Sequence, residues 1–183
     1  MIIIGITGTL GAGKGTIVEY LTEKKGFQHF SVRAFLTEEI ERREMPVNRD
    51  SMVSVANELR AQFSPGYIAE QLLERAKHSG KNCIIESIRT PGEIESLHRL
   101  GDFTLFAVDA KPELRYERIV SRASETDHIS YETFLDNEKR EMQSTDPNKQ
   151  NLSKCISMAD YIFENNGTME KLFAEVEKVI SSL

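Results

Sequence analysis

A glycine-rich segment near the N-terminus has the residue types and the spacing to bind phosphate groups. It reads Gly8-Thr9-Leu10-Gly11-Ala12-Gly13-Lys14-Gly15-Thr16 and follows a strongly apolar run. Its glycines allow the backbone to wrap closely around phosphate oxygens with several N–H groups pointing inward. Lys14 supplies a positive charge for β- and γ-phosphates, and the helix that begins there adds its own partial charge. These features predict a P-loop, and a chance glycine-rich turn is the alternative.

One position departs from the general P-loop pattern. Ser or Thr usually follows the lysine, where its hydroxyl binds Mg²⁺. Here Gly15 follows Lys14, and the hydroxyl comes one residue later, on Thr16. The sequence therefore predicts ATP and Mg²⁺ as cofactors, but it identifies no direct protein ligand for the metal.

The elements that must position this loop alternate along the chain. Apolar strand-like runs alternate with helical stretches, which indicates an α/β fold with a parallel sheet covered by helices on both faces. A helix is expected over Lys14–Lys25, further helices begin near Pro91 and Pro112, and residues 168–183 form an amphipathic helix. The five expected strands are Ile2–Thr7, Phe27–Val32, Asn82–Ser87, Thr104–Asp109 and Asp160–Phe163.

The stretch between the second and third strands, residues 33–79, is far longer than one crossover needs. It is helical in pattern and rich in charge, and Pro46 and Pro65 divide it into three expected helices. All 183 residues are expected to form one domain, with this stretch as an insertion.

Composition restricts the partners. The net charge is -6, with Asp+Glu 29 against Lys+Arg 23, so we expect no nucleic-acid partner, since such proteins present a basic face. No run is long enough to span a membrane, and residues 1–6 are too short for a signal-peptide core, so a cytoplasmic location is expected. The four histidines lack metal-ligand spacing, and Cys83 lies in an apolar run as a buried small hydrophobe would.

The run Gly-Ala-Gly-Lys-Gly-Thr resembles that of adenylate kinase and its relatives, the nucleoside monophosphate kinases and dephospho-CoA kinases. The resemblance extends over most of the chain, more weakly outside the P-loop. It implies a three-layer P-loop kinase fold with a helical acceptor-binding insertion over about 33–79 and a short lid over about 123–146. In that family the threonine meets the α-phosphate and the metal is held largely through water, and we carry this role to Thr16.

The third strand ends in a pair that the resemblance makes functional. In the relatives an acidic residue ends this strand and an arginine soon after binds the acceptor phosphate. Glu86 would then serve the water shell of the metal or the attacking oxygen, and Arg89 would grip a phosphate with two hydrogen bonds. A strand-end ion pair that only aids solubility is the alternative.

Further arginines are assigned by the same resemblance. Arg118 and Arg122 match two arginines four apart on one helix face, of which one packs on the adenine and one reaches the phosphates; a solvated basic face is the alternative. Arg115 lies outside that spacing and is expected to matter less. Arg140 would fold in with the lid. The turn containing Gly167 would pass the adenine, although it is equally a turn with no ligand.

The acceptor is expected at the carboxyl ends of the strands, beside the insertion. The candidates to bind it there are Arg33, Arg49, Asn57 and Arg60, together with Arg89 and Arg140. Adenylate kinases carry an arginine where this chain has Thr37, which argues against ordinary AMP kinase activity.

These observations leave three functions open. The leading hypothesis is an ATP-dependent kinase of a nucleoside or deoxynucleoside monophosphate, in which Lys14, Glu86, Arg89 and Arg122 serve catalysis. The others are a dephospho-CoA kinase and a nucleotide-binding regulator with little turnover. The chain also resembles kinase-like domains that are joined to dCMP deaminases, which implies a functional link to such an enzyme.

Overall fold

Five parallel strands form the centre of the protein in the computed structural model, which describes residues 1–122 and 129–183. Their order across the sheet is β2-β3-β1-β4-β5. The strands are β1 (Ile3–Gly8), β2 (Gln28–Ser31), β3 (Cys83–Glu86), β4 (Thr104–Asp109) and β5 (Tyr161–Glu164). The α/β fold class and the parallel sheet are confirmed, and each strand lies within a residue or two of its predicted bounds.

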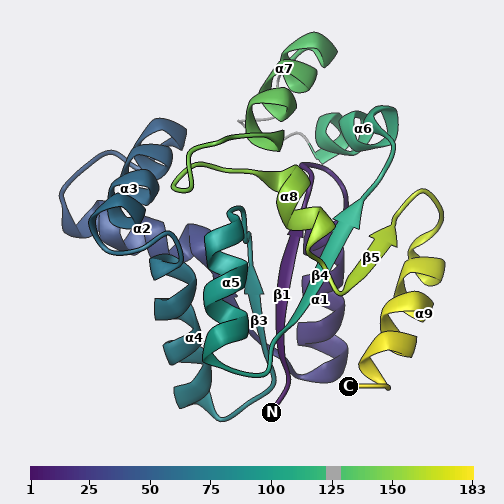
Figure 1. Ribbon diagram of the computed structural model, residues 1–183. Helices are drawn as coiled ribbons and strands as arrows, with labels where there is room; N and C mark the ends of the chain where they lie inside the picture. Colours follow the sequence, from purple (N-terminus) through teal and green to yellow (C-terminus); the bar gives the residue numbers. More distant parts are fainter. Residues whose placement is uncertain (123–128) are drawn as a thin grey trace.

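Helices cover both faces of the sheet because the apolar side chains of its central strands point alternately to the two sides. On one face, α1 (Lys14–Lys25) and α9 (Met169–Ile180) enclose the core that contains Ile4 and Ile6. On the other, α4 (Tyr67–Ser79), α5 (Pro91–Leu100) and α8 (Leu152–Ser157) pack near Ile3 and Leu105. Figure 1 shows these layers in side view.

The insertion consists of the three expected helices. They are α2 (Val32–Arg42), α3 (Arg49–Gln62) and α4. Ser31 and Asn48 accept hydrogen bonds from backbone N–H groups at the starts of α2 and α3, so each helix begins at a capped residue. Figure 1 places α2 and α3 at one side of the sheet, next to the ends of the strands.

Two helices flank the segment 123–128, which lies outside the described residues and belongs to the expected lid. They are α6 (Pro112–Arg122) and α7 (Tyr131–Met142). Figure 1 shows α7 beyond the edge of the sheet toward which the strand arrows point. Sequence patterning did not predict α7 or α8 as helices.

Both cysteines are buried and free. Cys83 begins β3 and is fully buried, as its apolar neighbours predict, and Cys155 of α8 packs in the core on the face that α4 and α5 also cover. Burial raises the pKa of the Cys155 thiol to about 12. Within residues 1–122 and 129–183, no helix has the length and apolar character needed to cross a membrane.

A buried ion pair joins the insertion to the sheet. Arg60 of α3 and Glu93 of α5 are 4% and 0% exposed, and the Arg60 Nη2 donates to Glu93 Oε1 at 2.8 Å. The second oxygen of Glu93 accepts from the backbone N–H groups of Arg89 and Thr90. Arg60 was expected to bind the acceptor, but its burial against Glu93 makes it a structural residue.

Loss of this pair should destabilise the fold. Arg60→Met leaves Glu93 buried without its counter-charge, so the free energy of unfolding should fall by about 3–5 kcal/mol. Arg33→Met on the exposed face of α2 is the control and should change it by about 0.5 kcal/mol or less. Urea denaturation of both variants measures the difference. Equal stabilities of the two variants would contradict the structural role.

Candidate active site

The P-loop connects β1 to α1 in the geometry that its glycines require. Gly11 and Gly13 have φ values of 77° and 105°, which side chains rarely adopt. A Cβ at Gly11 would also meet the backbone of Arg115, and one at Gly13 would meet the side chain of Asn165. Neighbouring elements therefore approach the loop so closely that only glycine fits at these two positions.

Lys14 is folded back on the loop that precedes it. Its Nζ donates to the carbonyl oxygens of Gly8 at 3.0 Å and Thr9 at 2.8 Å. Burial, followed by the nearby charge of Arg89, lowers the pKa of Lys14 to about 8, and the charges of Glu86 and Glu141 partly oppose this shift. Polyphosphate oxygens beside this ammonium group would stabilise its protonated form and raise its pKa again.

Three side chains outside the loop hold it in place. Thr9 Oγ1 donates to Asp109 Oδ1 at 2.6 Å, which ties the loop to the end of β4. Asn165 Nδ2 donates to the carbonyl of Ala12 at 2.9 Å. Arg118 Nη2 in turn donates to the carbonyl of Asn165 at 2.8 Å. Sequence reasoning missed Asn165, because the contact is between residues 153 positions apart.

The turn after β5 lies next to the P-loop, on the side where Asn165 and Arg118 contact it. Asn166 Oδ1 accepts from the backbone N–H of Lys111 at 2.8 Å, so the turn is fixed against the start of α6. Gly167 is exposed beyond it. Arg118 Nη1 is buried and has no hydrogen-bond partner among the residues that the structure describes. Arg122 is exposed at the end of α6.

Arg115 is a further residue whose importance the helix spacing did not indicate. Its side chain is 3% exposed and lies beneath the P-loop. Its Nε donates to the carbonyl of Ala110 at 2.7 Å, and its Nη1 donates to the carbonyl of Leu10 at 3.4 Å. Both Nη atoms also pair with the carboxylate of Glu138 on α7. These contacts give Arg115 a structural role, and its smaller expected effect on ATP binding stays a prediction.

Glu86 ends β3 next to β1. The register pairs it with Ile6, two residues before the P-loop begins. His29 Nε2 lies 3.0 Å from Glu86 Oε2, and this hydrogen bond is the largest cause of the lowered pKa of Glu86. The following residue, Ser87, has a φ of 72°, an uncommon conformation for a residue other than glycine. The turn there directs the chain toward Arg89.

Arg89 is brought together with Arg49 of α3, although 40 residues of sequence separate them. Arg89 Nη1 donates to Glu141 Oε2 at 3.0 Å and to Gln150 Oε1 at 2.8 Å. Arg49 Nη2 donates to the other oxygen of the same carboxylate, Glu141 Oε1, at 2.7 Å. Two guanidinium groups therefore converge on one anionic group.

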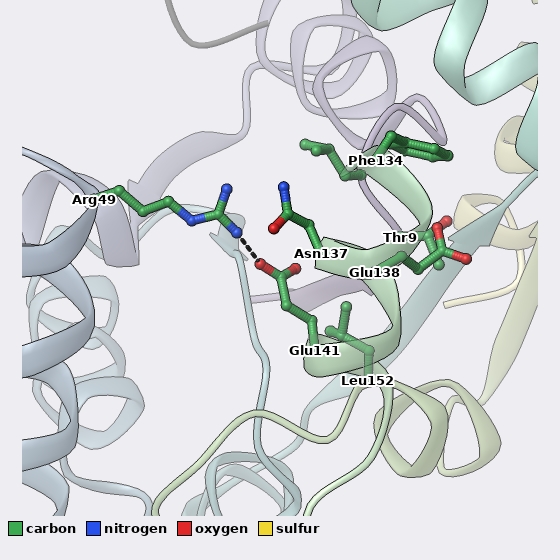
Figure 2. Close-up of a pocket in the computed structure, with 8 residues that line it drawn as sticks. Thr9, Arg49, Phe134, Asn137, Glu138, Glu141 and Leu152 are labelled. Carbon is green, nitrogen blue, oxygen red and sulfur yellow. Dashed lines mark hydrogen bonds and ion pairs between the residues drawn. The ribbon is translucent and has the colours of Figure 1, made fainter. Parts of the chain in front are cut away.

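Figure 2 shows this region as a pocket between α3, α7 and the P-loop. The Arg49–Glu141 ion pair, drawn as a dashed line, links α3 to α7 there. The residues that line the pocket are Thr9, Leu10, Arg49, Phe134, Asn137, Glu138, Glu141 and Leu152. Residues of the P-loop, α3, α7 and α8 thus line one pocket.

The structure separates other candidates from this pocket. Arg140 is exposed on α7, whereas Phe134, Glu138 and Glu141 of that helix line the pocket. Arg33 is exposed on α2 and Asn57 is half-buried on α3, and neither lines it. No group of three or more His, Cys, Asp or Glu side chains within residues 1–122 and 129–183 could hold a metal ion directly.

Comparison with known proteins agrees with this architecture. A family model described as an AAA domain matches residues 4–146. A UPF0200 protein of Pyrococcus abyssi is 27% identical over 187 residues, which cover 99% of this chain and 96% of that protein. A UPF0200 protein of Sulfurisphaera tokodaii is 28% identical over 183 residues, with 99% and 97% covered.

Solved structures show the same fold at lower identity. TT1252 from Thermus thermophilus matches with a TM-score of 0.67 and 22% identity, covering 100% of this chain and 97% of that one. Shikimate kinase from Bacteroides thetaiotaomicron matches with a TM-score of 0.58 and 14% identity, covering 98% of both chains. The P-loop kinase fold expected from the sequence is confirmed by these matches.

Nucleotide binding should take up a proton at mildly alkaline pH. With a pKa of about 8, roughly a quarter of the Lys14 side chains are protonated at pH 8.5 in the empty protein. Bound phosphates favour the charged form and raise that pKa, so ADP binding should take up about 0.7 proton. Calorimetry in two buffers of different ionisation enthalpy measures this number.

Two variants make the proton measurement specific. Lys25→Met removes a surface lysine of the same helix and should leave the uptake unchanged. Lys14→Met should abolish it, with ADP supplied at higher concentration to compensate for weaker binding. Uptake that persists in Lys14→Met would show that another group titrates.

Proposed function

The chain belongs to the AAA domain family and is a P-loop nucleotide kinase-like protein, and we propose that it transfers the γ-phosphoryl group of ATP to a nucleoside or deoxynucleoside monophosphate. One observation carries the proposal: Arg49 and Arg89 converge on a single carboxylate beside the P-loop. Because β3 pairs with β1 in parallel, the P-loop and Arg89 both follow the carboxyl ends of adjacent strands, which supports two neighbouring phosphate sites.

The donor half of the reaction would use the P-loop. Its N–H groups and Lys14 would hold the β- and γ-phosphates, and Thr16 would meet the α-phosphate. Arg118 lies against the loop through Asn165, so its guanidinium would lie beside a nucleotide bound there. Arg122, one turn further along α6, would supply a further positive charge.

Magnesium fits this site through water. Glu86 and Thr16 are the oxygen-bearing residues nearby that could bind its water shell, and the lowered pKa of Glu86 keeps its carboxylate charged. When bound, the ion would neutralise charge on the β- and γ-phosphates. His29 fixes the orientation of the Glu86 carboxylate.

The acceptor half would bind at Arg49 and Arg89. A phosphate oxygen of the acceptor attacks the γ-phosphorus, the bond from that phosphorus to the β,γ-bridging oxygen breaks, and ADP leaves with the electron pair. Lys14, Arg89 and Arg122 would stabilise the charge spread over the transferred group. Arg49 and Gln150 would position the acceptor without further chemistry.

An acceptor screen tests the proposal. ADP release is measured with each nucleoside monophosphate, each deoxynucleoside monophosphate and dephospho-CoA. We expect turnover with at least one monophosphate, and Lys14→Ala should lower it by about 100-fold or more, since one preorganised charge at the transition state contributes several kcal/mol. Turnover with dephospho-CoA alone would identify the alternative kinase. No turnover with any acceptor would favour a nucleotide-binding regulator.

Arg89→Lys should separate the acceptor site from the donor site. The substitution keeps the positive charge but loses the planar guanidinium that can form two parallel hydrogen bonds with a phosphate. We expect a higher acceptor KM, a lower kcat, or both, by about 10-fold. ATP-analogue affinity should remain nearly unchanged. Steady-state kinetics and an analogue titration give the two readouts, and a loss of ATP affinity alone would place Arg89 in the donor site.

A further inference from the structure

Helix α7 presents acidic side chains to the candidate site. Phe134, Glu138 and Glu141 are spaced four and three residues apart, so they lie on one face of the helix. All three line the pocket in Figure 2. Glu138 pairs with Arg115 beneath the P-loop, and Glu141 reaches toward the acceptor side.

Glu141 pairs with both arginines that the proposed function assigns to the acceptor. Its two oxygens each accept from a different guanidinium, at 2.7 Å from Arg49 and 3.0 Å from Arg89. Its charge also acts on Lys14, whose pKa it raises against the effect of burial. The Glu141 side chain is 18% exposed, and its partners Arg89 and Arg49 are 28% and 61% exposed.

We propose that Glu141 is a specificity-determining residue: its carboxylate fills the acceptor anion site of the empty protein and must be displaced by the acceptor. The inference rests on the proposed function in taking Arg49 and Arg89 as acceptor residues. The displacing group is a phosphate monoester, since it must compete with an anion already in place.

Charge explains the selectivity. A neutral hydroxyl is a poor replacement for Glu141, because the guanidinium of Arg89, which is 28% exposed, would lose its counter-charge. An acceptor carboxylate offers the same single charge and two oxygens that Glu141 already provides, without the advantage of covalent attachment. A phosphate monoester carries a charge of about -1.5 to -2 near neutral pH and three acceptor oxygens, so it can satisfy both arginines better.

The site is prepared for this exchange. Gln150 accepts a hydrogen bond from Arg89 independently of Glu141, and the backbone carbonyl of Arg89 accepts from the N–H of Asn151. Arg89 therefore keeps two contacts when Glu141 leaves. Helix α7 likewise keeps its contact with Arg115 through Glu138. Displacement of Glu141 would therefore break the contacts of α7 with Arg49 and Arg89, while the contact between Glu138 and Arg115 stays in place.

Direct binding of inorganic phosphate and of acetate tests the inference. Both are titrated calorimetrically at constant ionic strength, with ADP present to fill the P-loop. Glu141→Gln should raise phosphate affinity by about 10-fold or more, since a charged hydrogen-bonding competitor is removed. It should also allow acetate to bind, which the wild-type protein should not do measurably.

The control is Asp136→Asn, which removes the same charge from an exposed position of α7 and should behave like the wild-type protein. Arg89→Gln should abolish the gain when it is combined with Glu141→Gln. If Glu141→Gln does not fold, Glu141→Ala replaces it, since alanine suits a helix.

The inference is overturned if Glu141→Gln binds phosphate no better than Asp136→Asn, or if the gain survives Arg89→Gln. A gain in phosphate affinity that depends on Arg89 supports it even where the screen finds no phosphorylated acceptor. In that case the proposed kinase activity would be rejected, whereas the inference that Glu141 competes for an anion site would be supported.

Discussion

The arrangement of the site depends on the hydrogen bonds and ion pair that the buried guanidinium of Arg115 forms. This guanidinium lies under the P-loop and contacts Leu10, the end of β4 through Ala110, and α7 through Glu138. It also lies over the ring of Phe134, 5.4 Å from the ring centroid. A buried charge is stable only when its donors are satisfied, so the loop and α7 are constrained together by the same side chain.

The pairing of β1 with β3 in the sheet is a second constraint on the site. Because β3 pairs with β1 in parallel, Glu86 lies beside Ile6 and the chain after it leaves the sheet next to the P-loop. The charge of Arg89 then contributes to the lowered pKa of Lys14. Strand order therefore places the P-loop and the proposed acceptor residue Arg89 at neighbouring strand ends.

Features that depend on neighbouring residues could be predicted from the sequence. Apolar runs predicted the strands, and the glycine spacing predicted the P-loop, because both depend on neighbouring residues. The partners of charged side chains were not predictable in that way. Arg49 and Arg60 lie on the same helix, yet one lines the pocket and the other is buried against Glu93. Likewise Arg140 and Glu141 are consecutive, and only the rotation of α7 about its axis places Glu141 inward.

The enclosure of both cysteines has a practical consequence for observing α7. Cys83 and Cys155 are buried, and the raised pKa of Cys155 keeps its sulfur protonated and therefore unreactive toward alkylating reagents. A single cysteine introduced on the exposed face of α7 would be the accessible thiol in the described part of the protein. A fluorophore attached there would report the position of the helix without prior removal of the native cysteines.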